Sequence, residues 1–509
     1  MDENFGTMSM DSSVPLLEET YPVSPPFSYV LIQTNPVTQR TQYMVVEIPL
    51  DSKEKAIYNK ILEILIEELD VDFSVLKDFT KAEEYLKKKI VDVIKRYRIK
   101  LNENQFEKIM YYLTRDLIGF GKIQPLMLDP NIEDISCDGV GIPIYVWHRK
   151  YESIATNVSF DTEDELNSFI IKLAQRAGRH VSIANPLLDA SLEDGSRVQL
   201  TYGREVTQRG STFTIRKFKA DPFTITDLIL YNTIDIEIAA YYWFIMEHNV
   251  SILVAGGTAA GKTTLLNTLS MMIKPDMKIV TIEDTAELNL AHENWIPSVV
   301  RSGFGEATET GYRRGQISMY ELLRAAMRQR PDYIIVGEIR GEEAYAMFQA
   351  MSTGHRGLGT IHGDSVEGVI HRLESKPMNI PRSMMKSLDI IHVVRKVRHQ
   401  GKFARRTLTI TELIGLDPVT EEILTNKVFQ WNPREDSFIY FGRSYVLEKI
   451  MENTGITEQD IHDELERRKT VLRWMVKKRI RYFEDVASII QEYNSDPDRT
   501  LEKAKKALR

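Results

Sequence analysis

The stretch Ala255–Thr264 reads AGGTAAGKTT and follows the apolar run VSILV. A glycine, four residues and then Gly-Lys-Thr is the spacing of a phosphate-binding loop. Glycines in such a loop let successive N–H groups point at phosphate oxygens, and the helix that follows adds its positive end. The alternative is a glycine-rich turn that binds nothing. The placement between an apolar strand and a helix favours the phosphate loop.

This loop predicts a site for ATP and Mg²⁺. We expect Lys262 to hold the β- and γ-phosphates and the hydroxyl of Thr263 to hold the metal ion. The residues predicted to bind the nucleotide are Gly256, Gly257, Thr258, Ala259, Ala260, Gly261, Lys262, Thr263 and Thr264.

The composition describes a globular protein with more than one domain. The chain has 509 residues, which is too many for one ordinary core. Its net charge of -8 argues against a dominant nucleic-acid role, because proteins that neutralise phosphates usually carry a basic surplus. The single cysteine, Cys137, fits a reducing compartment, and no long uncharged apolar run or secretory signal is evident. We therefore expect a cytoplasmic protein that does not span the membrane.

Changes of pattern along the chain predict its organisation. We expect a flexible leader (1–28), a mixed α+β domain (29–219), a linker (220–230) and a C-terminal domain (231–509). The leader is rich in proline and lacks periodicity, whereas residues 29–50 alternate as in a hairpin of two strands. Thr226 is the expected cap of the first helix after the linker.

The C-terminal domain alternates strands with helices, which predicts an α/β fold with a mainly parallel sheet. Its expected strands are VSILVA, KIVTI, DYIIVG and GLGTIH. Binding sites of such sheets lie at the carboxyl ends of the strands. Carboxylates in two of these places could orient water and hold Mg²⁺ through coordinated waters, although acidic residues after a strand are also common in the first turn of a helix. The expected metal-binding residues are Thr263, Glu283, Asp284 and Glu338, with Glu287 close by.

Two other groups of residues allow a structural or a functional interpretation. His355 and His362 flank a predicted strand, but seven residues is not a usual zinc spacing, so each can equally be structural. Basic residues in the tail could face anionic lipid or an acidic partner, or simply form a solvated helix face. These residues are Arg467, Arg468, Lys469, Lys477, Lys478 and Arg481.

The four segments GGTAAGKTT, TIEDTAEL, YIIVGEIRGEEA and STGHRGLGTIHG stand in this order in the chain. Together they resemble the phosphate loop, Asp box, Walker B segment and His box of the ATPases of type II and type IV secretion systems and type IV pili. Upstream pieces resemble the N-terminal domain of the same superfamily, so the resemblance covers roughly residues 110 to 400. The absence of a four-cysteine metal site and the strand-rich tail are similar to the archaeal branch, closest to the archaellum motor and assembly ATPase.

The resemblance implies a RecA-like ATPase domain in a homohexameric ring with one nucleotide site at each subunit interface. Arg197 and Arg216 match arginines that close this site from the N-terminal domain, where a guanidinium stabilises charge on the transferred phosphoryl group. Glu287 matches the presumed base for the attacking water and Glu338 the Walker B acid. His362 matches a γ-phosphate sensor, with His355 nearer the interface.

One departure from the family concerns the loop itself. Many relatives have Gly-Ser where this chain has Ala259-Ala260. If residue 259 requires a positive φ, alanine there costs on the order of 1 kcal/mol.

The implied function is that of a motor at the inner face of the cell membrane. Its hydrolysis cycle would move the two domains about the linker and act on a polytopic membrane platform protein, with accessory motor proteins. The filament could be an archaellum, an adhesion pilus or a type II-like secretion pseudopilus. A nucleic-acid translocase and a nucleotide-gated scaffold without turnover are the alternatives from other classes; the acidic balance disfavours the first.

Overall fold

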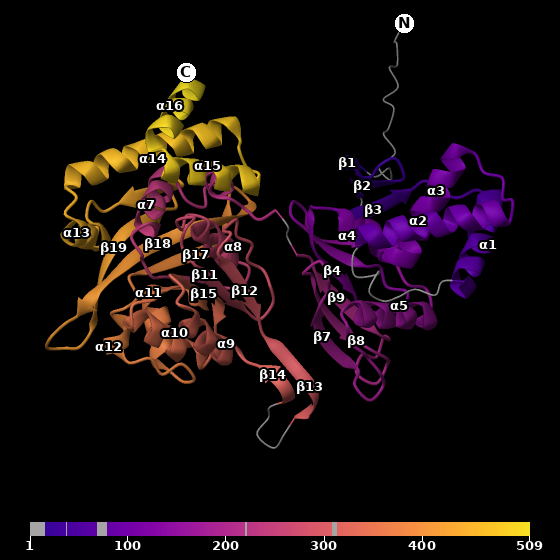
Figure 1. The fold of residues 1–509 in the computed structure, drawn as a ribbon, viewed down its shortest axis with the longest axis horizontal. Coiled ribbons are helices and arrows are strands. Elements are labelled where there is room, and N and C mark those ends of the chain that lie inside the picture. The colour runs from indigo at the N-terminus through magenta and orange to yellow at the C-terminus, as the bar shows by residue number, and fades with distance from the viewer. Residues whose placement is uncertain (1–15, 37, 69–78, 219–220, 308–312) are drawn as a thin grey trace, which may run out of the picture. The chain divides into compact units, whose positions relative to one another are not determined.

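The computed structural model describes residues 16–36, 38–68, 79–218, 221–307 and 313–509. The chain divides into two compact units, Met1–Phe218 and Lys219–Arg509, and each has its own nine-stranded sheet and its own apolar cores (Figure 1). Among the helices of the described ranges, none has both the length and the apolar character that crossing a membrane requires.

The sheet of the first unit has the order β1-β2-β3-β6-β5-β4-β9-β8-β7. Its neighbouring strands are antiparallel except for the parallel pair β3 and β6. The strands are β1 (Leu16–Ser24), β2 (Ser28–Thr34), β3 (Thr41–Glu47), β4 (Ile132–Cys137), β5 (Tyr145–His148), β6 (Glu152–Thr156), β7 (Leu187–Ser191), β8 (Arg197–Thr201) and β9 (Thr212–Arg216).

The helices of the first unit form two groups. Helices α1 (Ser52–Glu68), α2 (Phe79–Arg96) and α3 (Glu103–Leu113) pack their apolar faces on one another in a small core of their own. The short α4 (Gln124–Leu128) and α5 (Glu163–Arg176) contribute instead to the core of the sheet. This unit is therefore the mixed α+β domain that the sequence predicts.

The predicted flexible leader over residues 1–28 requires a correction. Residues 1–15 lie outside the described part of the chain, but β1 pairs with β2 from Leu16↔Thr34 to Ser24↔Ser28. The hydroxyl of Tyr21 on β1 donates a 2.6 Å hydrogen bond to Asp129. Strand pairing and this contact outweigh the prolines that suggested an irregular segment. The expected hairpin after residue 28 is confirmed by β2 and β3.

The sheet of the second unit has the order β12-β11-β15-β16-β10-β17-β18-β19-β20. Strands β12 through β17 in this order are parallel, and the last three are added antiparallel. The strands are β10 (Ile252–Gly256), β11 (Ile279–Glu283), β12 (Trp295–Val299), β15 (Tyr333–Ile339), β16 (Arg356–His362), β17 (Ile390–His399), β18 (Lys402–Leu416), β19 (Ile423–Asn432) and β20 (Ser437–Tyr440), beside a separate hairpin of β13 (Arg301–Ala307) and β14 (Arg313–Ile317). The predicted α/β fold with a mainly parallel sheet is confirmed.

Helices cover both faces of this sheet (Figure 1). On β10, Ile252 and Val254 enter one core whereas Leu253 and Ala255 enter the other, as the two-residue period of a strand requires. One face carries α6 (Ile225–Leu230), α7 (Ile236–Met246), α8 (Lys262–Ser270), α13 (Tyr445–Thr454), α14 (Glu458–Lys478), α15 (Phe483–Ser495) and α16 (Pro497–Leu508); the other carries α9 (Met319–Ala326), α10 (Glu343–Ser352), α11 (Val366–Glu374) and α12 (Arg382–Met385). A strand buried on both sides explains the continuous apolar run that precedes the phosphate loop.

Part of the predicted linker is also helical. Helix α6 begins two residues earlier than expected, because Thr224, and not Thr226, is its N-cap and forms a capping box with Asp227. Asp227 in turn accepts a hydrogen bond from Arg481, and Asp221 accepts one from the backbone N–H of Phe483. Residues 221–230 of the predicted linker are thus bound to the second unit by these hydrogen bonds.

Two of the basic residues in the tail, Arg468 and Lys469, are neither lipid-facing nor simply solvated. Arg468 on α14 is buried and donates hydrogen bonds to Glu464, Glu247 and the carbonyl oxygen of Trp243, at 2.9, 2.8 and 2.7 Å. Lys469 pairs with Glu237 on α7. Charged groups of this helix therefore fasten it to the core of the second unit.

Replacement of Arg468 by alanine should lower the free energy of unfolding by about 3–5 kcal/mol, because it leaves the buried carboxylate of Glu247 without its cation. Arg473→Ala on the same helix, where the side chain is half exposed, is the matched control and should change stability by less than about 0.5 kcal/mol. Urea unfolding of the full chain measures both. Equal losses of unfolding free energy in the two variants would contradict a stabilising buried ion pair between Arg468 and Glu247.

Candidate functional site

The phosphate loop connects β10 to α8 at the carboxyl edge of the second sheet. A Cβ on Gly256 would lie 2.4 Å from the carbonyl oxygen of Val394, so only glycine fits there. Gly261 has φ +93° and is the N-cap of α8, whose first residue is Lys262. The free N–H groups of the first helical turn therefore face the region that the loop encloses.

Ala259 has φ +57°, in the left-handed region. Residue 259 therefore does adopt a positive φ. An alanine in this conformation lowers the stability of the loop by about 1 kcal/mol. Contacts around the loop must therefore offset the unfavourable conformational free energy of Ala259.

Lys262 is buried, and its Nζ donates a 2.9 Å hydrogen bond to the carbonyl oxygen of Gly257. Burial is the main cause that lowers the pKa of this ammonium group, while the carboxylates of Glu338, Asp364 and Glu287 act in the opposite direction. Those carboxylates are consequently close enough to act on Lys262. An ammonium group in such surroundings favours an anionic ligand.

Glu338 and His362 lie beside this lysine on neighbouring strands. The carboxylate of Glu338, near the end of β15, accepts a 2.6 Å hydrogen bond from Arg340, and its Oε1 lies 2.9 Å from Nε2 of His362 at the end of β16. Burial pushes the pKa of Glu338 upward, but the hydrogen bond from Arg340 and the charges of Arg340, His362 and Lys262 outweigh it and lower this pKa. Glu338 is therefore ionised at neutral pH.

The pKa of His362 is lowered, first by burial and then by the charge of Lys262. The imidazole is consequently neutral near pH 7 and can both donate and accept a hydrogen bond. The predicted approach of His362 to the phosphate loop is explained by its register, since it pairs with Gly256 across β10 and β16.

Glu283 binds the backbone of the segment that follows β11. Its Oε1 accepts hydrogen bonds from the backbone N–H groups of Glu287 and Leu288, both at 3.0 Å. Burial raises the pKa of Glu283 to about 7. Glu283 therefore shapes the turn that presents Glu287, whose side chain is exposed.

The predicted set of metal ligands is only partly suitable. Among the described residues, no three His, Cys, Asp or Glu side chains gather as a metal site. Glu283 faces backbone amides, and Asp284 is exposed with its carboxylate 3.8 Å from Arg340. Thr263 in the first turn of α8 and Glu338 do fit a Mg²⁺ ion that takes its other ligands from phosphate and water, since Oε1 of Glu338 is buried and its 2.9 Å approach to Nε2 of His362 is not a well-aligned hydrogen bond.

His355 is not part of this cluster. It precedes β16, whereas His362 ends it, so the two are separated by the length of a strand of about 20 Å at 3.3 Å per residue. His355 thus lies at the amino edge of the sheet, away from the phosphate loop.

Arg197 and Arg216 belong to the first unit, where they are directly opposite each other on β8 and β9. Their side chains consequently share one face of the sheet. Arg197 pairs with Asp189 at 2.6 Å, and Arg216 lies 3.4 Å from Asp134. Both guanidinium groups are at least two-fifths exposed, so an anion could reach them.

Three residues near the loop were not predicted. Arg340 pairs with Glu338, and Asp364 has an oxygen 3.4 Å from the position that a Cβ on Gly257 would take. Both stand within two residues of predicted site residues, so proximity in the sequence could have indicated them. Arg405 on β18 donates a hydrogen bond to the carbonyl oxygen of Ala259. No local sequence pattern predicts this contact.

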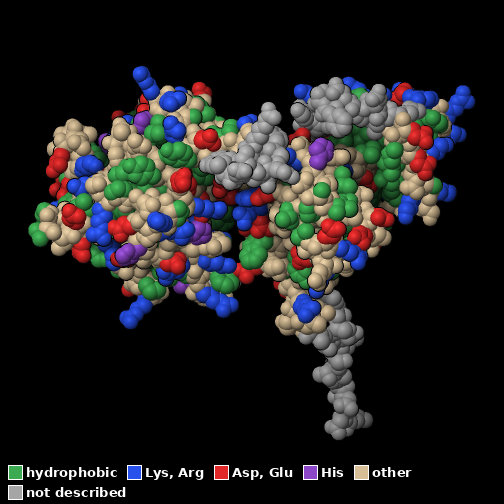
Figure 2. Space-filling view, turned by 90° about the horizontal axis from the view of Figure 1, so that it is seen from below, with side chains coloured by type: hydrophobic (Ala, Val, Ile, Leu, Met, Phe, Trp, Pro, Cys, Tyr) green, Lys and Arg blue, Asp and Glu red, His purple; other side chains and the backbone are tan. Residues whose placement is uncertain are grey.

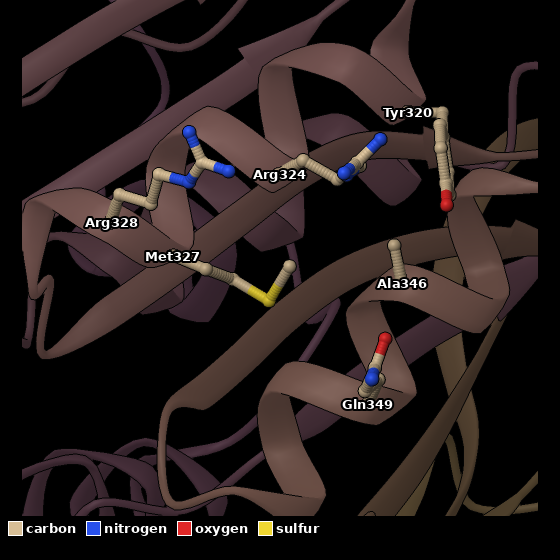
Figure 3. Close-up of a pocket in the computed structure, with 6 residues that line it drawn as sticks. All are labelled: Tyr320, Arg324, Met327, Arg328, Ala346 and Gln349. Atoms are coloured by element: carbon tan, nitrogen blue, oxygen red, sulfur yellow. The ribbon is translucent and has the colours of Figure 1, made fainter.

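A separate cavity of about 470 Å³ lies between α9 and α10. Tyr320 and Arg324 border it on α9, and Ala346 and Gln349 on α10 (Figure 3). Its lining contains no residue of the phosphate loop, so it is distinct from the candidate nucleotide site.

The phosphate loop at the carboxyl edge of a parallel sheet, with acidic residues on neighbouring strands, defines a P-loop nucleotide-binding domain of RecA-like type. Comparison with known families makes this more specific. Residues 120–492 match the family described as Type II/IV secretion system protein, and the chain belongs to this family.

The chain is also similar to individual proteins. The uncharacterized protein MJ0900 of Methanocaldococcus jannaschii is 38% identical over 492 residues, which cover 92% of this chain and 88% of that protein. The type IV secretion system protein PtlH of Bordetella pertussis is 33% identical over 278 residues, or 48% of this chain and 80% of PtlH. The solved structure of the pilus retraction motor PilT with bound ADP has 19% identity and a TM-score of 0.41, covering 72% of this chain and 94% of that one.

The buried carboxyl group of Glu283 predicts a pH dependence of stability. Its pKa is higher in the folded than in the unfolded chain, so the folded state binds more protons between about pH 4.5 and 7 and loses stability as the pH rises through this range. Glu283→Gln keeps an oxygen acceptor for the two backbone N–H groups and cannot ionise. The variant should gain about 1–3 kcal/mol relative to the unsubstituted chain between pH 5 and pH 8, measured by urea unfolding. A difference that stays constant with pH would contradict this environment for Glu283.

Proposed function

We propose that this protein hydrolyses ATP with Mg²⁺ and uses the cycle to drive a type IV pilus-like filament or a related secretion machine. It would act as a homohexamer at the inner face of the cell membrane, on a polytopic platform protein and with accessory motor proteins. The observation that carries the proposal is the convergence of Lys262, Glu338 and His362 at the carboxyl edge of the second sheet. The family match supports the general class of secretion ATPase.

The residues at this edge suit phosphoryl transfer to water. The loop amides and Lys262 bind the β- and γ-phosphates, and neutral His362 hydrogen-bonds to the γ-phosphate. Glu287 orients the attacking water and accepts its proton while the bond from the γ-phosphorus to the bridging oxygen breaks, which releases ADP and phosphate. Mg²⁺, held by Thr263 and through water by Glu338, would neutralise charge on the phosphates.

Arg197 and Arg216 are proposed to complete the site of a neighbouring subunit. Their guanidinium groups lie on one face of the first unit, partly exposed, and each pairs with a carboxylate. An incoming γ-phosphate could replace these carboxylates, because both are anionic oxygen acceptors for the same planar donors. Changes in the relative orientation of the two units would then follow the state of the nucleotide.

The filament type stays open among the archaellum, an adhesion pilus and a secretion pseudopilus. PtlH is named as a type IV secretion system protein, so a secretion role is as consistent with the family as an archaellum role.

The face shown in Figure 2 does not suggest a nucleic-acid groove. On the face that Figure 2 shows, Lys and Arg side chains are interspersed with Asp and Glu side chains and do not gather in one basic groove. A groove that tracks a nucleic-acid backbone needs a continuous positive surface.

Glu338→Gln should lower the rate of ATP hydrolysis at least about a hundredfold and leave ADP affinity within about threefold, because the neutral amide no longer balances the charges around Lys262. Phosphate release and equilibrium ADP binding measure the two effects. Glu342→Gln is the matched control, since this exposed glutamate lies four residues along the same segment and should retain nearly full activity. Unchanged phosphate release from Glu338→Gln would contradict a role of Glu338 in ATP hydrolysis.

Mixing experiments test the action of the arginines across subunits. Arg216→Ala and Lys262→Ala should each abolish most of the hydrolysis alone, whereas mixed rings should recover part of it, because some interfaces then combine an intact loop with an intact arginine. Hydrolysis after mixing and reassembly is the readout. If mixing restores nothing, the arginines do not act in trans.

A further inference from the structure

The hairpin of β17 and β18 reaches beyond the end of β10 to the phosphate loop. Strand β17 pairs with β10 only as far as Ala255↔Val393 and then continues to His399, while β18 returns antiparallel to it from Lys402. The overhanging part carries several basic residues. Two of them contact the backbone of the candidate site from opposite strands.

Arg405 on β18 contacts both loop residues that have left-handed backbone. Its Nε donates a 3.3 Å hydrogen bond to the carbonyl oxygen of Ala259, which has φ +57°. Its Cδ lies 3.1 Å from the position that a Cβ on Gly261 would take. From β17, Arg395 donates a 3.0 Å hydrogen bond to the carbonyl oxygen of Asp364.

The backbone of Arg405 is itself fixed. The next residue, Arg406, is buried and pairs with both carboxylate oxygens of Asp436 at 2.7 Å. The Nη1 of Arg406 also donates hydrogen bonds to the carbonyl oxygens of Arg405 and Tyr231. An exposed side chain on such an anchored backbone can hold a flexible loop, because little of its own chain has to be ordered.

We infer that Arg405 is a positioning residue of the phosphate loop, whose hydrogen bond stabilises the left-handed conformation of Ala259 that nucleotide binding requires. The inference rests on the proposed nucleotide site and adds a residue from the C-terminal strands to it. It also explains how the loop tolerates alanine at a position where glycine is free of strain.

A dependence on residue 259 distinguishes this role from direct attraction of phosphate. Glycine at 259 adopts a positive φ without support, so the hydrogen bond from Arg405 should matter little in that background. Attraction between the guanidinium and phosphate, in contrast, would be the same with alanine or glycine at 259.

Equilibrium binding of Mg²⁺-ADP to the full chain tests the inference by a double-mutant cycle of Arg405→Met and Ala259→Gly. Methionine keeps an unbranched stem against Gly261 but removes the N–H donor and the charge. We expect Arg405→Met to weaken ADP binding about five- to tenfold with Ala259, and less than about twofold with glycine at 259. Arg398→Met, an exposed arginine of the same hairpin, should change affinity less than about twofold.

Three results would overturn the inference: no loss from Arg405→Met, an equal loss in both backgrounds, or full affinity in Arg405→Lys, which keeps the charge but moves the donor. Recovery of binding by Ala259→Gly supports it and excludes misfolding as the cause of the loss. If the unsubstituted chain binds no ADP, the proposed function fails as well; if it binds ADP and Arg405→Met changes nothing, only this inference fails.

Discussion

The parallel pairing of β10 with β16 on one side and β17 on the other is the constraint on which the candidate site depends. In-register pairing places Gly256 opposite His362, and the close approach of Val394 leaves no room for a side chain at residue 256. The phosphate loop must therefore begin at this point, where the chain leaves the sheet. The same pairing fixes the start of the overhang formed by β17 and β18.

Charges at this edge of the sheet depend on one another. The pKa values of Lys262, Glu338 and His362 are all lower than usual, and burial acts on each of them while their mutual charges oppose or reinforce it. Glu338 is consequently an anion and His362 a neutral imidazole near pH 7, while the neighbouring carboxylates counteract the effect of burial on the ammonium group of Lys262. Glu283 differs, since burial dominates there and its acceptor capacity is used by backbone N–H groups.

The sequence predicts well what local spacing determines. The strand-loop-helix context of the phosphate loop and the parallel order around it follow from apolar runs and glycine positions, which act over a few residues. Strand β1 was not predicted because proline-rich composition outweighed a short alternation, and because tertiary contacts such as the hydrogen bond from Tyr21 to Asp129 stabilise what local propensity does not. Helix α6 was expected, but its start was placed two residues too late. The contacts of Arg468 were not predicted for a related reason, because a charge run does not reveal that Glu247 at the C-cap of α7 lies beside it.

Arg405 shows most clearly where such prediction ends. It is one of two adjacent arginines, and neighbouring residues of a strand point to opposite faces. Strand β18 pairs Thr409 with Val393 and Thr407 with Val394, so Leu408 is an extra residue that shifts the alternation. This bulge determines that Arg405 lies on the loop and Arg406 on Asp436. Without it, the faces of the two arginines would exchange, and the loop would contact the residue that now anchors the strand.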